Sequence, residues 1–177
     1  MRASCSLSGA VLLLVAVAAS AQPADRSSSP NDEFEGKAWE EIKTALPPYP
    51  APSNLVRIYV GPTTAFEFYV DTSSLSVTQT GIIRYTLVAR SSSGAMNVSY
   101  DGIRCDSRER RSYAFGRFDG TWMQARSSQW VPIGRAQAES QYATLADDFF
   151  CPQGGRVRTV EEAVLALTRG SGPGAGK

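Results

Sequence analysis

The middle of the chain, from about residue 55 to residue 123, restricts the fold more than any other feature of the sequence. β-branched and aromatic residues alternate there with polar ones, which is typical of strands with one buried face. Asp71 is expected to open a turn, because its side chain can bond the backbone ahead of it. The expected strands cover Leu55–Val60, Phe66–Val70, Ile82–Ala89 and Met96–Cys105. Because the links between them are short, antiparallel pairing is favoured over crossover helices.

The dipeptide Asp119-Gly120 lies between two alternating segments and is a strong hairpin signal. A two-residue turn there would pair Arg117 with Trp122, and Arg117 could lie over the indole ring. One face of the hairpin would then carry Tyr113, Phe115 and Trp122, and the other Ala114, Gly116, Phe118 and Met123. The sequence leaves open which face is core, although an aromatic row on a strand is more often core than a binding platform.

Helical patterns are expected on both sides of this region. Trp39, Ile42 and Leu46 form one stripe of a short amphipathic helix, and the Pro-rich stretch 47–52 then ends it as an extended connector. Residues 136–148 fit a second helix, and Thr159 is expected to cap a third. The expected fold class is α+β, an antiparallel sheet of about five or six strands with a short N-terminal helix and C-terminal helices.

The first 21 residues have the pattern of a cleaved secretory signal. Residues 10–19 form an apolar run, and Ala19-Ser20-Ala21 supplies the small residues that precede a cleavage site. The run is about half the length that a membrane-spanning helix needs. The expected organisation is a signal peptide (1–21), a disordered polar leader (22–36), a single domain (37–169) and a flexible Gly-rich tail (170–177). The mature chain is expected to be soluble and periplasmic or secreted, with no transmembrane segment.

Two cysteines, Cys105 and Cys151, would remain after cleavage, because Cys5 leaves with the leader. In an oxidising compartment such a pair usually forms a disulfide. A redox-active site would favour a close Cys-x-x-Cys spacing, which the chain lacks. Two thiols without any histidine do not fill a tetrahedral zinc shell. The expected role of the pair is structural, and no metal or other cofactor is expected.

The charge and histidine content restrict the possible functions. Without Arg2 the chain carries 17 Lys and Arg residues against 17 Asp and Glu residues, so no nucleic-acid partner is expected. The absence of histidine removes the usual Ser-His-Asp and Cys-His devices. Paired carboxylates stay possible for glycoside chemistry, with four candidate residues: Asp71, Asp101, Asp147 and Asp148.

A polar set on the third and fourth expected strands is a candidate binding surface. It consists of Arg84, Asn97, Asp101 and Arg104. Arg84 and Arg104 could anchor a carboxylate or a sugar, because guanidinium presents a rigid donor fork. The alternative is a solvent-exposed sheet face with Arg and Asp pairs.

Five sequence blocks follow one another along the chain: ALPPYP, FYVDTSSLSV, IIRYTLVARSSSGAMNVSYDGIRC, YAFGRFDGTW and DDFFCP. In these blocks and their order, from about Trp39 to Leu167, the chain resembles the CNP1-like family of small exported bacterial proteins of undetermined function. The resemblance supplies no catalytic or binding residue. Thr80-Gly81 stands where an Asp-Gly turn is usual, and Tyr142 stands where histidine is common. The strand layout is more loosely similar to surface-adhesin protein E, which would imply an envelope binding role.

The expected function is that of a noncatalytic envelope protein that binds a protein partner or a cell-wall glycan, with its oligomeric state open. The alternatives are a carboxylate-dependent hydrolase and a structural or stress-protective envelope protein. An enzyme of the first kind should present two carboxylates that face each other across a cleft. A binding module should instead show a charged or aromatic patch.

Overall fold

The computed structural model describes residues 46–152 and 155–170 of the 177-residue chain. The expected signal peptide and polar leader lie outside the described residues. So do the expected N-terminal helix, except for Leu46, and the tail after residue 170.

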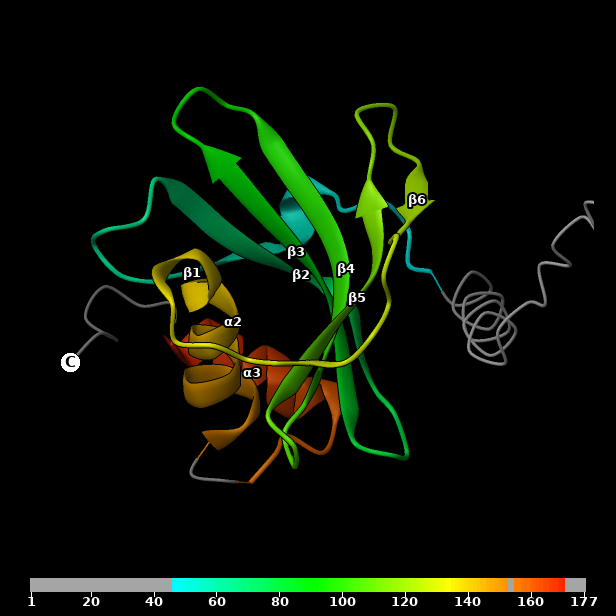
Figure 1. Cartoon of the computed structure of the whole chain (residues 1–177), viewed down its shortest axis with the longest axis vertical. Coiled ribbons are helices and arrows are strands. Elements are labelled where there is room, and N and C mark those ends of the chain that lie inside the picture. Colours follow the sequence, from blue (N-terminus) through cyan, green and yellow to red (C-terminus); the bar gives the residue numbers. More distant parts are fainter. Residues whose placement is uncertain (1–45, 153–154, 171–177) are drawn as a thin grey trace, which may run out of the picture.

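The described chain forms an antiparallel sheet of seven strands (Figure 1). The strands are β1 (Leu55–Ile58), β2 (Phe66–Val77), β3 (Ile82–Ser91), β4 (Met96–Arg104), β5 (Glu109–Gly116), β6 (Trp122–Gln124) and β7 (Val131–Pro132). The first six lie side by side in chain order, and β7 pairs with the free end of β5. The short links thus predict the antiparallel pairing correctly. The sheet exceeds the expected five or six strands by the two-residue β7.

Helices follow the sheet and cover part of one face (Figure 1). One continuous helical run comprises the 3-10 turn η2 (Gln137–Glu139), α2 (Ser140–Thr144) and the π-helical turn η3 (Leu145–Phe150). It matches the helix that the sequence predicts over residues 136–148. The last helix, α3 (Val160–Gly170), begins after Thr159, whose hydroxyl accepts a hydrogen bond from the Glu162 amide at 3.2 Å. Thr159 is therefore the cap that the sequence predicts.

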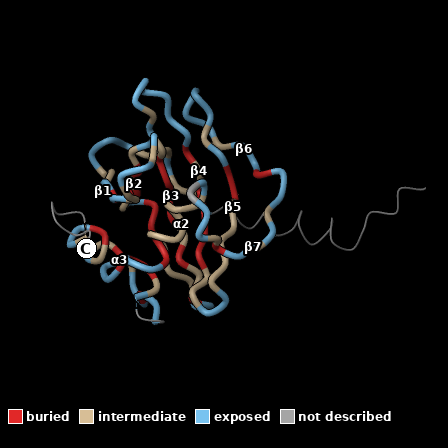
Figure 2. The backbone as a smooth tube through the Cα atoms, turned by 60° about the vertical axis from the view of Figure 1, so that its left-hand side comes forward, coloured by how far each residue is buried: buried red, intermediate tan, exposed pale blue. Residues whose placement is uncertain are grey.

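The main core lies between the helices and the sheet, where buried segments of the central strands meet η3 and α3 (Figure 2). The rings of Tyr85 and Phe150 pack with their centroids 5.2 Å apart. Several other side chains of this core are fully buried: Val70, Ile83, Ile103, Leu145, Ala163 and Leu167. Odd-numbered residues of β3 and β4 face the helices, as the period of two in a strand requires.

The opposite face of the sheet has a smaller core, covered by the extended segment 46–51 and the 3-10 turn η1 (Pro52–Asn54). The Trp122 indole donates a hydrogen bond to the Pro47 carbonyl at 3.0 Å, and the Tyr49 ring lies 5.7 Å from the Trp122 ring. Gly116 permits this contact, because a Cβ there would lie 2.8 Å from the Tyr49 ring. The aromatic residues Tyr100 and Tyr113 are buried beneath, so they are core rather than a binding platform.

The hairpin between β5 and β6 forms at the predicted place, but the predicted register and faces are wrong. Its loop has three residues, because the Arg117 amide bonds the Thr121 carbonyl and Gly120 takes a φ of 78°. This arrangement is a tight turn followed by a left-handed glycine. In addition, β5 has a bulge at Tyr113. Tyr100 pairs with Ala114 and Asp101 pairs with Ser112, so Tyr113 has no partner in the ladder with β4.

The bulge and the longer loop together separate the expected aromatic row. Phe115 faces the helix side of the sheet, opposite Ser99 in the ladder, whereas Tyr113 and Trp122 belong to the second core. Trp122 contacts the rings of Tyr49 and Tyr100 in place of the expected Arg117 guanidinium.

The turn expected at Asp71 is an irregularity inside a longer strand. The Asp71 carboxylate accepts hydrogen bonds from the amide and hydroxyl of Ser73, at 2.9 and 2.6 Å. The Ser74 hydroxyl bonds the Asp71 carbonyl and also accepts the Thr86 amide at 2.7 Å. These bonds replace missing ladder bonds, so β2 bends but continues to Val77.

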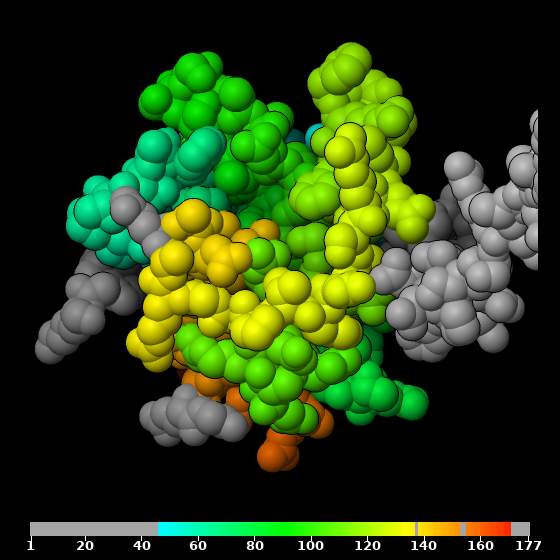
Figure 3. Space-filling view, viewed as in Figure 1, coloured from blue at the N-terminus to red at the C-terminus, as the bar shows by residue number. Residues whose placement is uncertain are grey.

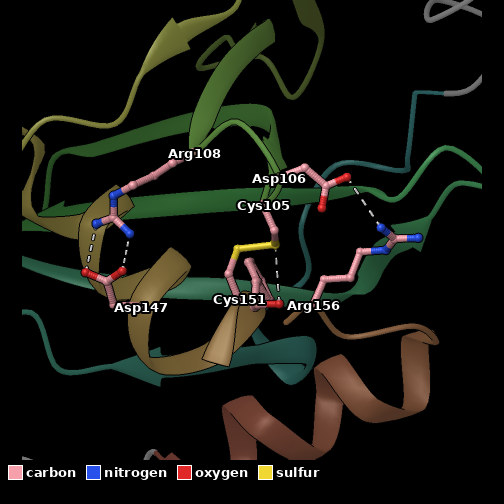
Figure 4. Close-up of a disulfide and its surroundings, with 7 residues drawn as sticks. Cys105, Asp106, Arg108, Asp147, Cys151 and Arg156 are labelled. Atoms are coloured by element: carbon pink, nitrogen blue, oxygen red, sulfur yellow. Dashed lines mark hydrogen bonds and ion pairs between the residues drawn. A yellow bond between two sulfur atoms is a disulfide. The ribbon is translucent and has the colours of Figure 1, made fainter. Parts of the chain in front are cut away.

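A disulfide between Cys105 and Cys151 joins the β4–β5 turn to the end of the helical run, as the sequence predicts. Ion pairs lie on either side of it, one between Arg108 and Asp147 and the other between Arg156 and Asp106 (Figure 4). The charged side chains are more than one-third exposed, so each pair adds little to stability. The covalent bond therefore dominates this junction.

Replacing both cysteines, as Cys105→Ala with Cys151→Ala, should lower the free energy of unfolding by about 4 kcal/mol. The reason is that the disulfide closes a loop of 46 residues and restricts the unfolded chain. Urea denaturation of the variant measures the loss, and reduction of the wild-type protein should reproduce it. The control Arg108→Gln, which removes only a neighbouring ion pair, should cost about 1 kcal/mol or less. An unchanged stability in the double variant would contradict the prediction.

Candidate binding pocket

A pocket of about 720 Å³ opens on the helix-facing side of the sheet, beyond the part that the helices cover. Its wall comes from the loop before β2, from β2 to β5, and from the start of the helical run. Figure 3 shows this hollow between the β3–β4 hairpin, α2 and the loop that precedes β2. Its volume lies within the range of small-molecule sites, about 300 to 1,000 Å³.

Strand periodicity brings the lining residues together. Phe66 and Phe68 of β2, Leu87 of β3 and Phe115 of β5 all point to the helix side, where η3 and α3 cover only the other end of the sheet. Phe66 and Phe115 are 38% and 39% exposed, so aromatic surface remains open to solvent at the rim. Polar groups in the lining include Asn97, Ser99, Gln141 and Tyr142.

A buried carboxylate lies behind this wall. Asp101 has no exposed surface, and its two oxygens accept hydrogen bonds from the hydroxyls of Ser99 and Ser112, at 2.5 and 2.6 Å. The bulge at Tyr113 sets this geometry, because it points Ser112 toward Asp101. Ser99, which also lines the pocket, thus connects the pocket wall to the carboxylate.

Burial controls the protonation of this cluster. Loss of water raises the pKa of Asp101 to about 6, and the hydrogen bonds from Ser112 and Ser99 offset only part of that rise. Burial, followed by the charge of Asp101, raises the pKa of Tyr142, so its hydroxyl stays protonated. The guanidinium carbon of Arg110 lies 4.3 Å from the centroid of the Tyr142 ring, and the same guanidinium forms an ion pair with Glu139. The Tyr85 hydroxyl is buried in the same region with no hydrogen-bond partner in the described structure.

The four residues predicted as a binding surface are divided between the two faces of the sheet. Asn97 lines the pocket, and Asp101 lies behind it. Arg84 and Arg104 point to the opposite face, where Arg104 lies 4.2 Å from the Trp130 ring centroid. The set therefore does not converge on one ligand.

Arg84 is part of a stacked group on that second face. The Tyr113 ring has the guanidinium carbons of Arg84 and Arg111 at 5.4 and 5.3 Å from its centroid. Gly102 lies beneath the ring, and a Cβ there would come within 2.8 Å of the Tyr113 hydroxyl. These arginines thus pack against an aromatic ring of the second core.

The candidate carboxylates are also dispersed. Asp71 lies on the second face, opposite Thr86 in the ladder, whereas Asp101 is opposite Tyr85 on the helix side. Asp147 pairs with Arg108 beside the disulfide. None of the four residues lines the pocket.

Sequence reasoning did not identify most of the pocket residues. The alternation along β4 places Asn97, Ser99 and Asp101 on one face and Arg104 on the other, because residues two or four apart share a face and residues three apart do not. This pattern alone could have shown that the predicted binding surface is divided. Phe115 and Ser112 could not be assigned in the same way, because the bulge at Tyr113 interrupts the period of two.

None of the helices in the described part of the chain is long and apolar enough to span a bilayer. Within residues 46–152 and 155–170, no group of three or more Cys, Asp or Glu side chains is placed to hold a metal ion.

The model of one protein family, described as the CNP1-like family, matches residues 34–168, which include almost all of the described structure. The chain belongs to the CNP1-like family. No significant match is found among curated proteins or solved structures. The looser likeness of strand layout to surface-adhesin protein E therefore stays a prediction.

In this CNP1-like protein the variant Asp101→Asn should remove a pH dependence of stability. The pKa of Asp101 rises from 3.8 to about 6 on folding, so the folded protein holds a proton that the unfolded chain releases between those values. Stability from this group therefore falls as pH rises from about 4 to about 6, by about 3 kcal/mol in total. The asparagine variant does not titrate at this position.

Urea denaturation of both proteins at pH 4 and pH 7 measures the effect as a difference between wild type and variant, which cancels the other titrating groups. Relative to the variant, the wild-type protein should have a lower free energy of unfolding at pH 7 than at pH 4. Asp106→Asn, at a side chain that is 75% exposed, serves as the matched control. A difference that stays constant between the two pH values would exclude a raised pKa at Asp101.

Proposed function

We propose that this CNP1-like protein is an exported, noncatalytic binding protein of the bacterial cell envelope. The pocket is its binding site for a protein partner or a cell-wall component. The single observation that carries the proposal is the open, largely aromatic and aliphatic hollow of about 720 Å³ beside α2. Pockets of this composition, with a few polar groups that fix orientation, are typical ligand sites.

The chemistry of the lining supports binding rather than catalysis. Its side chains are aromatic, aliphatic, amide and hydroxyl groups. The carboxylate bonded to this wall, Asp101, is fully buried and separated from the hollow by Ser99. A glycosidase would instead place two carboxyl groups across an open cleft.

The rim extends the apolar surface beyond the hollow. Met123 lies opposite Phe115 in the ladder and is 44% exposed. Exposed aromatic and methionine side chains of this kind are enriched where proteins bind partners. The rim therefore offers a second zone of contact around whatever enters the pocket.

Export is supported by the leader and the disulfide together. The first 21 residues have the pattern of a secretory signal. Cys105 and Cys151 are bonded in the structure, which suits an oxidising compartment such as the periplasm.

Photo-crosslinking in the native envelope tests the binding site. A photoreactive residue at Phe115 should capture a reproducible partner or glycan, because this side chain lies at the pocket rim. The same residue at Leu165 of α3, which is similarly exposed at 45%, should not capture it. Capture that is equal at both positions, or none at Phe115, would remove the support for a binding function at the pocket.

Mass spectrometry of the naturally produced protein tests the compartment. The intact mass should correspond to a chain that begins at Gln22 and has lost two hydrogens to the disulfide. Alkylation of the unfolded protein without reductant should label neither cysteine. Retention of the leader, or two free thiols, would contradict export.

A further inference from the structure

At Ser99 the pocket presents a hydrogen-bond acceptor rather than a donor. The Ser99 hydroxyl has a single hydrogen, and it is given to the Asp101 carboxylate at 2.5 Å. The Ser112 hydrogen is likewise given to the other Asp101 oxygen. The Ser99 oxygen therefore has only lone pairs left for a group inside the pocket.

The net charge behind the pocket wall is negative, so it also favours a hydrogen-bond donor at Ser99. Asp101, Arg110 and Glu139 together carry one net negative charge when Asp101 is ionised, because Arg110 is paired with Glu139. A nitrogen at hydrogen-bond distance from the Ser99 oxygen would lie within about 5.5 Å of the Asp101 carboxylate. A cation at that point is favoured, and an anion is disfavoured.

The walls fit the same ligand. The rings of Phe66, Phe68, Phe115 and Tyr142 surround the hollow, and the side chains that line it carry no formal charge. Ring faces attract cations, and the apolar surface accepts a hydrocarbon body. Among the described residues that line the pocket, none is an arginine or lysine that could hold a carboxylate or a phosphate.

We propose that the pocket binds an amphiphile whose apolar body packs against the aromatic wall and whose alkylammonium group donates to the Ser99 oxygen, with Asp101 as the buried counter-charge. This inference rests on the proposed function and names the class of ligand for the same site.

Calorimetric titration with three probes of equal chain length tests the selectivity. The probes are n-octylammonium, n-octanol and n-octanoate, each below its aggregation limit and at pH 7.5. Octylammonium should bind about tenfold more tightly than octanol, as expected when a charge-assisted hydrogen bond replaces a neutral one. Octanoate should bind more weakly than octanol.

Variants separate the roles of the residues. Asp101→Asn and Ser99→Ala should each reduce the preference for ammonium over alcohol to about twofold or less, with little change in octanol affinity. Phe115→Ala should weaken all three probes and keep their order, because it removes wall area only. Because Asp101→Asn alters a buried site, Ser99→Ala provides the test if that variant fails to fold.

Two results would overturn the inference. One is octanoate binding as tightly as octylammonium, and the other is an ammonium preference that survives both Asp101→Asn and Ser99→Ala. Capture of an envelope partner at Phe115 without any ammonium preference would overturn the ligand class and leave the proposed function standing. Ammonium preference without capture at Phe115 would support the ligand class and count against an envelope partner.

Discussion

Packing of the helical run 137–150 against one face of the sheet determines both the core and the pocket. Tyr85 and Phe150 meet at the centre of that contact, and the disulfide to Cys105 fixes its end. The sheet is longer than the helices that cover it (Figure 1). The uncovered part keeps apolar side chains such as Phe66 and Phe115 at the surface, and these form the pocket wall.

The bulge in β5 links the two faces of the sheet. On the helix side of the sheet, Ser112 bonds the buried Asp101 carboxylate. On the opposite side, the neighbouring Tyr113 packs in the second core. In a regular strand Ser112 and Tyr113 would also lie on opposite faces, but Phe115 would point away from the pocket. One extra residue therefore supports the Asp101 network, the aromatic core and the pocket rim at once.

The sequence predicts those parts of the fold that depend on local chemistry. The strands, the helix over 136–148, the Thr159 cap and the disulfide follow from periodicity, capping and cysteine count. Bulges are less accessible to such reasoning, because they depend on tertiary packing. The irregularity after Asp71 lies where a turn was predicted, and the bulge at Tyr113 changes the predicted faces of the hairpin. The pocket itself depends on where the helices stop along the sheet, which no local pattern encodes.

The segment before β1 gives the domain a direction. Leu46 and Pro47 lie against Trp122 on the face opposite the helices. The polypeptide thus enters the folded unit from behind the sheet, while the mouth of the pocket opens in front. The first described residues and the pocket are thus separated by the thickness of the sheet.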